Sequence, residues 1–167
     1  MQTVTKTLYA LTAADLMSNT VVTIPKEMSI RGAAHLLAQH QISGAPVVDD
    51  QGRCIGVFST TDVVYWADRG NYVTARSNPD LRCAHSAWQV LDAEPSPDDG
   101  VGRYMTLDPV TAPPTTPVKE LAHMMADAHI HRVIIVDGEG RPAGIVSSMD
   151  VLAAVAQAPG KPVDQRW

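Results

Sequence analysis

Two short segments of this 167-residue chain each combine a hydroxyl with a carboxylate three positions later, Ser59-Thr60-Thr61-Asp62 and Ser147-Ser148-Met149-Asp150. An aspartate can accept hydrogen bonds from both hydroxyls of a ribose, as acidic residues do in other nucleotide folds. A serine at the start of a helix lies beside unpaired backbone N–H groups and the positive end of the helix dipole, which favour a phosphate. The two segments therefore have the chemistry to hold a ribose and a phosphate.

The same spacing is also that of a helix capping box. In a capping box the serine caps the first turn, and the acidic residue three positions later accepts a hydrogen bond from the backbone N–H of the serine. Spacing alone does not separate a cap from a ligand site, so both interpretations are open from these residues.

The two segments belong to an internal repeat. When the sequence is shifted by 88 positions, residues 17–63 align with residues 105–151 without a gap, and 16 of the 47 pairs are identical. Only two copies are present, so a closed pair related by pseudo-two-fold symmetry is a simpler interpretation than an open solenoid. Such a pair makes equivalent pockets from its two halves.

Each half shows the pattern of a β-α-β-β-α unit. Apolar residues at helical spacing, short β-branched runs and Asp/Gly-rich turns predict the same elements in the same order. In the first half they are a strand at 20–24, a helix at 29–39, a hairpin of strands at 45–48 and 53–58, and a helix at 59–67. In the second half they are a strand at 109–112, a helix at 117–127, strands at 133–136 and 142–146, and a helix at 147–156.

The predicted fold class is therefore α+β or α/β, with two such repeats and a helical insertion between them. We expect the first repeat at 10–67, the insertion at 68–102, the second repeat at 103–157 and a flexible tail at 158–167. Within the insertion, Asn78-Pro79-Asp80 is typical of a helix start, because a polar cap precedes a proline at the first helical position.

The composition narrows the class of protein. A formal net charge of −5 argues against a nucleic-acid-binding surface, which normally carries a basic patch. No apolar run approaches the roughly 18 residues needed to cross a bilayer, and the first residues lack the pattern of a secretory signal. Two isolated cysteines do not make a disulfide framework. We expect a cytoplasmic protein that binds neither membrane nor nucleic acid.

Each half resembles a CBS domain, and the two in tandem resemble a Bateman module. The resemblance lies in the pattern Gly-apolar-apolar-Ser/Thr-x-x-Asp, which is found at Gly56–Asp62 and at Gly144–Asp150. It implies two clefts between the repeats that hold adenine-containing ligands. It also implies a protein that senses rather than catalyses and that pairs into homodimers. The ligand class implied is AMP, ADP or ATP, with S-adenosylmethionine and NAD as alternatives.

Carried over position by position, the resemblance also implies which residues contact the ligand. Ser59, Thr60 and Asp62, with Ser147, Ser148 and Asp150, would contact ribose and phosphate. A second segment, Gly44-Ala45 in the first half and His131-Arg132-Val133 in the second, would line the same clefts. The first strands would supply walls to the base at Thr23, Pro25, Thr111 and Pro113, although ordinary strand residues are an equal interpretation for the two threonines.

The two halves differ at that second segment. Arg132 offers a planar fork of donors suited to phosphate and His131 a further donor, whereas the equivalent Gly44 carries no charge. We therefore expect the half with Arg132 to bind a phosphate-bearing ligand more tightly. The family often has proline where Ile134 stands, as the first half does at Pro46, and this departure makes the shape of the segment a point to check.

The leading hypothesis is a regulatory module that binds an adenine nucleotide and signals in trans to an unidentified partner protein. The alternative is a ligand-free dimerisation or protein-interaction module. We do not expect an enzyme, because the sequence has no nucleophile–base set and no Gly-rich phosphate loop with lysine. We also expect no metal site, since neither His129-x-His131 nor Cys83-x-His85 has the ligand pattern of structural zinc.

Overall fold

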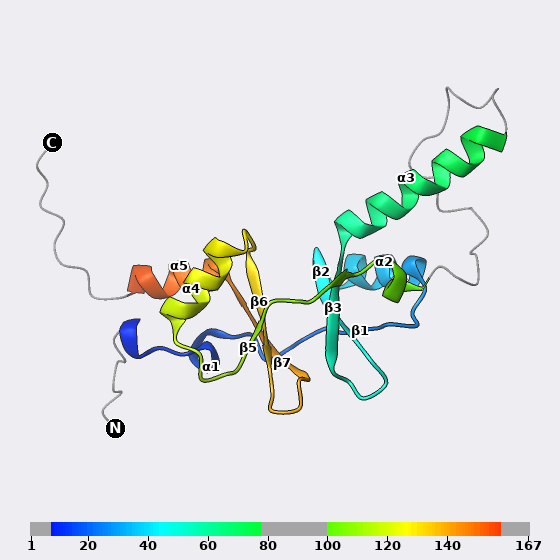
Figure 1. Ribbon diagram of the computed structural model, residues 1–167. Coiled ribbons are helices and arrows are strands. Elements are labelled where there is room, and N and C mark those ends of the chain that lie inside the picture. The colour runs from blue at the N-terminus through cyan, green and yellow to red at the C-terminus, as the bar shows by residue number, and fades with distance from the viewer. Residues whose placement is uncertain (1–7, 78–99, 158–167) are drawn as a thin grey trace, which may run out of the picture. The chain divides into compact units, whose positions relative to one another are not determined.

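The computed structural model describes residues 8–77 and 100–157, which form two units with separate sheets and cores (Figure 1). Unit 1 combines the described residues of 1–21 with those of 110–167, and unit 2 is 22–109. The two predicted repeats of mixed α and β structure are present. None of the helices in the described part of the chain is long and apolar enough to cross a membrane.

Unit 2 is a four-stranded sheet with two helices. The sheet has the order β1-β2-β3-β4, in which β1 is parallel to β2 and the other neighbours are antiparallel. Its elements are β1 (Ile24–Pro25), α2 (Ile30–Gln39), β2 (Gly44–Val48), β3 (Cys54–Ser59), α3 (Thr60–Ser77), the 3-10 turn η4 (Val101–Arg103) and β4 (Thr106–Leu107).

Unit 1 has the same plan, with a three-stranded sheet in the order β5-β6-β7. Strand β5 is parallel to β6, and β6 is antiparallel to β7. Its elements are the 3-10 turn η1 (Leu8–Ala10), α1 (Ala13–Leu16), β5 (Thr111–Ala112), α4 (Val118–Asp127), β6 (Arg132–Val136), β7 (Pro142–Ser147) and α5 (Ser148–Gln157).

Each core lies between the sheet and an amphipathic helix. In unit 2 the apolar side of α2, with Ile30, Ala33 and Leu37, is buried against Val47 and Phe58 of the sheet. In unit 1 the equivalent helix α4 buries Leu121 and Met125 against its own sheet. Burying a side chain of this size contributes about 1.5–3 kcal/mol, so these helices fix the strands that carry the candidate site.

The segment that leads into the first repeat packs in the core of unit 1, and the segment that leads into the second repeat packs in the core of unit 2. Ala13, at the start of the first repeat, is fully buried in the core of unit 1, where Leu16 and Met17 pack beside it. Val101, 88 positions later, is fully buried in the core of unit 2, with Tyr104 and Met105 beside it. The two repeats therefore exchange their leading segments.

Two equivalent glycines receive the exchanged methionines. A Cβ at Gly144 would lie 2.5 Å from Met17 Sδ, and a Cβ at Gly56 would lie 2.7 Å from Met105 Sδ. Real Cβ atoms do not approach other atoms this closely, so a side chain at either position would displace the methionine that packs there. The backbone pairing beside them is Ser18 with Ile145 in unit 1 and Thr106 with Val57 in unit 2.

The predicted elements differ from the structure mainly at their ends. Helix α3 continues to Ser77, about ten residues beyond the predicted end at 67, and strand β1 is shorter than the predicted 20–24. The segment ahead of the first strand contains the 3-10 turn η1 and the single-turn helix α1, for which the sequence analysis assigned no element. The helix expected to begin at Asn78 and the tail at 158–167 lie outside the described residues.

Candidate functional site

The serine–aspartate pairs close the first turn of α3 and α5. In unit 2 the Oδ2 atom of Asp62 accepts hydrogen bonds from the backbone N–H and the Oγ of Ser59, both at 2.7 Å. In unit 1 the Oδ2 atom of Asp150 accepts from the N–H and the Oγ of Ser147 at 2.7 and 2.6 Å. The backbone N–H of Asp150 also donates to Ser147 Oγ at 3.2 Å, so the helix α5 has a reciprocal cap.

The capping interpretation therefore describes the geometry of these pairs in this structure. Capping does not use every acceptor position of the carboxylates, because a carboxylate has two oxygens and about four acceptor positions. Within the described residues, all hydrogen bonds to Asp62 and Asp150 end on Oδ2. The cap holds each carboxylate in one orientation and leaves Oδ1 for a further donor.

The strand register brings the second candidate segment to the same place. Gly44 lies opposite Ser59 in the β2–β3 pair, and Arg132 lies opposite Ser147 in the β6–β7 pair. Residues directly opposite in an antiparallel pair have Cα atoms about 4.5–5.5 Å apart. Each unit thus gathers the serine–aspartate pair and the start of the neighbouring strand at one end of its hairpin.

The residues next to these positions hold the start of each helix to the neighbouring strand. The backbone N–H of Thr60 donates to the carbonyl of Ser43, and the backbone N–H of Ser148 donates to the carbonyl of His131, both at 2.9 Å. His131 and Arg132 are exposed, whereas Ser147, Ser148 and Asp150 are half-buried. The candidate site of unit 1 is therefore open to solvent on its cationic side.

At Gly44, the position in unit 2 that is equivalent to Arg132, there is no positive charge and little space for a side chain. A Cβ at Gly44 would lie 3.3 Å from the carbonyl oxygen of Phe58 and from Ser59 Cβ, which is closer than most such contacts. The glycine therefore lets the strands approach closely but offers only its backbone to a ligand.

The other predicted site residues lie farther away or face inward. Ala45 and Val133 are buried in the two cores, so only their backbone groups are available to a ligand. Pro25 lies opposite Val48, four residues along β2 from Gly44, and at about 3.3 Å per residue this is about 13 Å. Thr23 precedes Ile24, which pairs with Val47, so it lies nearer to Gly44 than Pro25 does.

The same arrangement holds in unit 1. Thr111 pairs with Ile134, two residues along β6 from Arg132, whereas Pro113 follows the end of β5. The departure at Ile134, which stands where unit 2 has Pro46, leaves the local shape unchanged: β2 and β6 have equivalent bounds and the same register shift before their last residue. Of the predicted wall residues, the structure thus brings the threonines closer to the serine–aspartate ends than the prolines.

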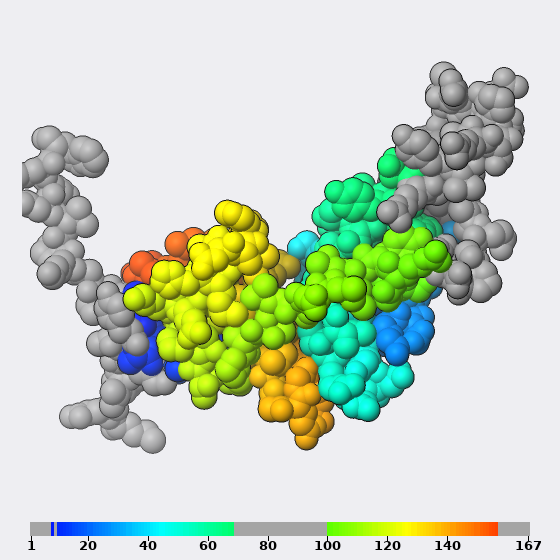
Figure 2. All heavy atoms as spheres, in the orientation of Figure 1, coloured from blue at the N-terminus to red at the C-terminus, as the bar shows by residue number. Residues whose placement is uncertain are grey.

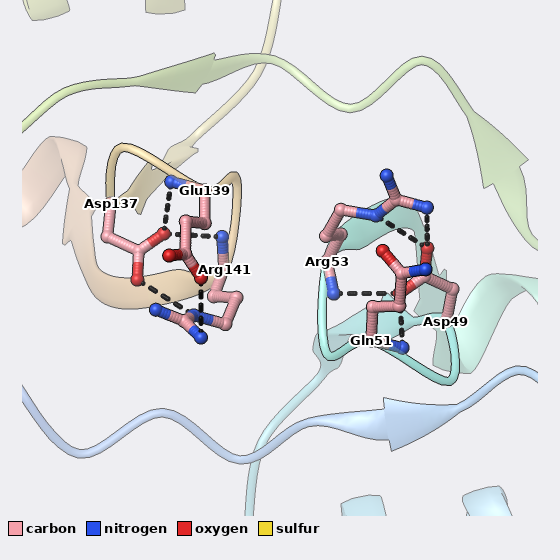
Figure 3. Close-up of polar contacts among 6 residues, drawn as sticks. All are labelled: Asp49, Gln51, Arg53, Asp137, Glu139 and Arg141. Carbon is pink, nitrogen blue, oxygen red and sulfur yellow. Dashed lines mark hydrogen bonds and ion pairs between the residues drawn. The ribbon is translucent and has the colours of Figure 1, made fainter.

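Each hairpin turn is fixed by an aspartate–arginine pair that the sequence interpretation treated only as a turn (Figure 3). Asp49 Oδ1 accepts from the backbone N–H groups of Gln51 and Arg53 at 2.9 Å, and its Oδ2 lies 2.8 Å from Arg53 Nη2. These contacts, first of all the backbone hydrogen bond from Arg53, lower the pKa of the Asp49 carboxyl.

Asp137 repeats this pattern in unit 1. It accepts from the backbone N–H of Arg141 at 2.9 Å and from Arg141 Nε at 3.0 Å, and its pKa is lowered by the same contacts. Arg141 also lies 2.7 Å from Glu139, and the hydrogen bond to Asp137 together with both charges raises the pKa of Arg141. The exact match of Asp and Arg between the repeats is the signal that could have found this pair.

Both turns lie at the surface, cyan in unit 2 and orange in unit 1 (Figure 2). The paired charges there stabilise the hairpins that carry the serine–aspartate ends and are not themselves part of the candidate site. No group of three or more His, Cys, Asp or Glu side chains within the described ranges could hold a metal ion. The Cys54 thiol is half-buried, and burial raises its pKa, which suits a packing role.

Comparison with known proteins identifies the repeats. The family model of the CBS domain matches residues 13–69 and 101–157, which together make up more than half of the chain. The chain is 26% identical over 133 residues to the chloroplastic CBS domain-containing protein CBSX2 of Arabidopsis thaliana, covering 77% of this chain and 56% of that protein. It is also 26% identical over 137 residues to L-aspartate semialdehyde sulfurtransferase of Methanocaldococcus jannaschii, covering 82% of this chain and 22% of that protein.

The chain therefore spans between about a fifth and just over half of the length of these relatives. Solved structures share the fold. CBSX2 in complex with AMP has a TM-score of 0.65 at 22% identity and is matched over 87% of this chain and 96% of that one. The CBS domain pair of MJ0100, in complex with 5-methylthioadenosine and S-adenosyl-L-methionine, has a TM-score of 0.63 at 24% identity, over 88% and 97% of the two chains.

A third structure, the cytosolic domain of the Mg2+ channel MgtE in complex with ATP, has a TM-score of 0.61 at 26% identity, over 85% of this chain and 48% of that one. The matched regions begin at the exchanged segments and end in the helices that follow the serine–aspartate pairs. The chain belongs to the CBS-domain family and carries two copies of the domain in tandem.

Proposed function

We propose that this chain is a regulatory module that binds an adenine nucleotide of the AMP, ADP or ATP class and passes the signal to a partner protein. The observation that supports the proposal is the register of unit 1, in which Arg132 lies opposite Ser147, whose hydroxyl donates a hydrogen bond to the carboxylate of Asp150. One strand end thus combines a guanidinium for phosphate with a carboxylate for ribose.

The comparisons support the ligand class. Family members with the same fold are described in complex with AMP, with ATP, and with S-adenosyl-L-methionine and 5-methylthioadenosine, all of which contain adenosine. S-Adenosylmethionine and NAD remain the alternatives to a simple nucleotide. The protein acts in this proposal in a reducing, cytoplasmic compartment, which suits a chain with only two cysteines.

In this proposal the ligand at unit 1 is held by Arg132 and His131 at the phosphate, by Asp150 Oδ1 at the ribose, and by the hydroxyl groups of Ser147 and Ser148 at the start of α5. Unit 2 offers Ser59, Thr60 and Asp62 but no cation at Gly44, so it binds a phosphate-bearing ligand more weakly. No step of bond making or breaking is involved. In this proposal the module senses a ligand and does not catalyse a reaction.

Titration calorimetry with AMP, ADP and ATP on wild type and Arg132→Ala tests the proposal. A hydrogen bond to a charged group contributes about 1.5–3 kcal/mol, so Arg132→Ala should weaken the nucleotide about tenfold or more. The matched control is Lys119→Ala, which removes one exposed positive charge from the same unit but away from the candidate site. If no nucleotide binds wild type at millimolar concentration, or if both variants bind equally, the proposal is wrong.

The second candidate function is a dimerisation module without a ligand. It is favoured by exposed apolar residues on α5, where Met149, Leu152 and Val155 are 68%, 58% and 50% exposed, and on α3, where Val64 and Tyr65 are each 65% exposed. Large exposed apolar patches mark interaction sites. We propose that these faces pair two copies of the chain into a homodimer, which is compatible with either function.

Light scattering at micromolar concentration tests the homodimer. Wild type should have twice the mass of the chain, and Leu152→Asp should be monomeric because the charge would be buried in the interface. Thr115→Asp, which adds the same charge at an exposed turn of the same unit, should remain a dimer. A monomeric wild type would refute the dimer. A thermal shift assay with a panel of nucleotides then separates the two functions. A nucleotide at 100 times its Kd adds about 2.7 kcal/mol to the free energy of unfolding, whereas a module without a ligand shows no shift.

A further inference from the structure

The segment that leads into the first repeat is attached to unit 1 by backbone hydrogen bonds that do not involve the candidate site. The backbone N–H of Ala13 donates to the carbonyl of Thr116 at 2.8 Å, and the backbone N–H of Val118 donates to the carbonyl of Leu11 at 3.0 Å. These bonds tie the segment to the connection between β5 and α4. We call residues 11–18 the leading segment of unit 1.

The other end of the leading segment lies against β7. The backbone N–H of Ser18 donates to the carbonyl of Ile145 at 3.0 Å, and the N–H of Ile145 donates back to the carbonyl of Ser18 at 3.1 Å. Helix α1, just before Ser18, contacts both β7 and α5, and Met17 packs on Gly144. The leading segment therefore borders both elements that meet at the serine–aspartate pair of unit 1.

The cap of α5 lies on the same edge of β7 as Ser18. Both backbone groups of Ile145 point to Ser18 and away from β6, and in an antiparallel pair this direction recurs at every second residue. The backbone N–H of Ser147 therefore points to the same edge, where it donates to Asp150 Oδ2 at 2.7 Å. The same alternation makes Ser147 and Arg132 a narrow pair, the type in which side chains lie closest.

Unit 1 depends on Ser18 more than unit 2 depends on the equivalent Thr106. In unit 2 the outer edge of β3 is paired at two positions, Gly56 with Leu107 and Val57 with Thr106. In the part of unit 1 that the structure describes, the outer edge of β7 is paired only at the bridge to Ser18. Removing one backbone donor therefore removes a larger share of the edge pairing in unit 1.

We propose that the leading segment is an additional element of the nucleotide site of unit 1, and that the backbone of Ser18 positions Ser147 and Asp150. In this proposal Ser18 does not touch the ligand. It holds the last residues of β7 at the spacing from Arg132 at which phosphate and ribose are bound together. The inference rests on the proposed nucleotide binding, but the support of the strand end can be measured without a ligand.

Titration calorimetry with AMP on full-length Ser18→Pro and Ser18→Ala tests the effect on binding. Proline removes the N–H that donates to Ile145, whereas alanine keeps it and removes only the exposed hydroxyl. Ser18→Pro should weaken AMP at unit 1 about fivefold, the factor expected for one neutral hydrogen bond, and Ser18→Ala should bind as wild type does. Thr106→Pro, the equivalent change in unit 2, should leave the site of unit 1 unchanged.

The same affinity in Ser18→Pro as in wild type would overturn the proposal. An equal loss in Ser18→Ala would overturn it as well, because the effect would then belong to the hydroxyl and not to the backbone. An equal loss at unit 1 in Thr106→Pro would show a general effect of proline and would also overturn it.

Amide hydrogen exchange of the ligand-free chain separates positioning from a general loss of stability. In Ser18→Pro the amide of Ser147 should exchange about fivefold faster than in wild type, by the same hydrogen-bond factor. The amides of Val133 and Ile135, which are buried in the core of unit 1, should keep their wild-type rates. Equal acceleration at Ser147 and in the core would mean that Ser18 acts on the stability of the whole unit, and would overturn the proposal.

Met17→Ala is the second variant, and it decides the question if Ser18→Pro does not fold. It removes the side chain that packs on Gly144 and leaves every backbone donor in place. It should weaken AMP and accelerate exchange at Ser147 by smaller factors than Ser18→Pro. If wild type binds no AMP, the proposed function fails and the exchange rates still decide the positioning. Wild-type exchange at Ser147 in both variants, or in Met17→Ala alone where Ser18→Pro does not fold, would overturn it.

Discussion

The ends of the two hairpins have the same backbone and different charge. In both, an aspartate closes the first turn of the following helix through a serine, and the neighbouring strand starts directly opposite that serine. At that opposite position unit 2 has Gly44 and unit 1 has Arg132. The two repeats therefore share the backbone of the candidate site, and the proposed preference of unit 1 for a phosphate-bearing ligand rests on one residue outside the repeated pattern.

The same contrast applies to the glycines that receive the exchanged segments. At Gly56 an added Cβ would lie 2.8 Å from the backbone carbonyl oxygen of Thr106, which is fixed by the β3–β4 pairing. At Gly144 the close atoms all belong to the Met17 side chain. A side chain can change its rotamer, whereas a paired backbone carbonyl cannot move without its strand, so the contact at Gly144 is easier to relieve.

The largest stability effect is therefore expected at Gly56. Overpacking costs about 1–3 kcal/mol, and we expect Gly56→Ala to lower the free energy of unfolding by about 3 kcal/mol and Gly144→Ala by about 1 kcal/mol. Urea denaturation of the two variants measures this. Gly138→Ala is the control, because nothing lies within 4 Å of a Cβ there. Equal losses at Gly56 and Gly144 would mean that both segments are held equally firmly.

A smaller effect is expected at the turns. The pKa values of Asp49 and Asp137 are lowered in the folded state, so each contributes stability above its unfolded pKa of about 3.9, and this contribution is lost as the pH falls through the lower folded pKa. Arg53→Ala and Arg141→Ala should make stability less dependent on pH, but only in part. The backbone hydrogen bond from position 53 or 141, which is the largest cause of the lowered pKa, remains in these variants.

Comparing urea denaturation at pH 7 and pH 3 checks the turn prediction. Arg141→Ala should lower stability at pH 7 more than Arg53→Ala, because Arg141 pairs with Glu139 as well as with Asp137. Both effects are small, as exposed ion pairs are weak. A pH dependence unchanged by either substitution would show that the arginine side chains do not affect their aspartates.

The periodicity of the sequence was sufficient to predict the helix–hairpin–helix part of each repeat. Apolar residues at helical spacing and a capping Ser29 predicted α2, and the Asp/Gly turns predicted both hairpins, because these signals are local. The continuation of α3 to Ser77 was missed because Gly70 is typical of a helix end. Helix propensity is a weak signal that the surrounding structure overrides.

The exchange of leading segments was not predictable in the same way. Met17 and Met105 are equivalent, as are Gly56 and Gly144, so the pattern fits a segment packed on its own repeat as well as on the other. Which partner is used depends on contacts far apart in the sequence. The serine–aspartate pairs were predicted by position, and their capping geometry was one of the two interpretations that spacing left open.

The most direct test of the central claim is AMP binding to Asp62→Asn and Asp150→Asn, measured by titration calorimetry. Each substitution keeps the size of the side chain and removes the same charge from equivalent sites in the two repeats. Because only unit 1 has a guanidinium opposite its serine, Asp62→Asn should keep the tight site, and Asp150→Asn should weaken it about tenfold or more. Equal loss in the two variants, or greater loss in Asp62→Asn, would contradict the claim.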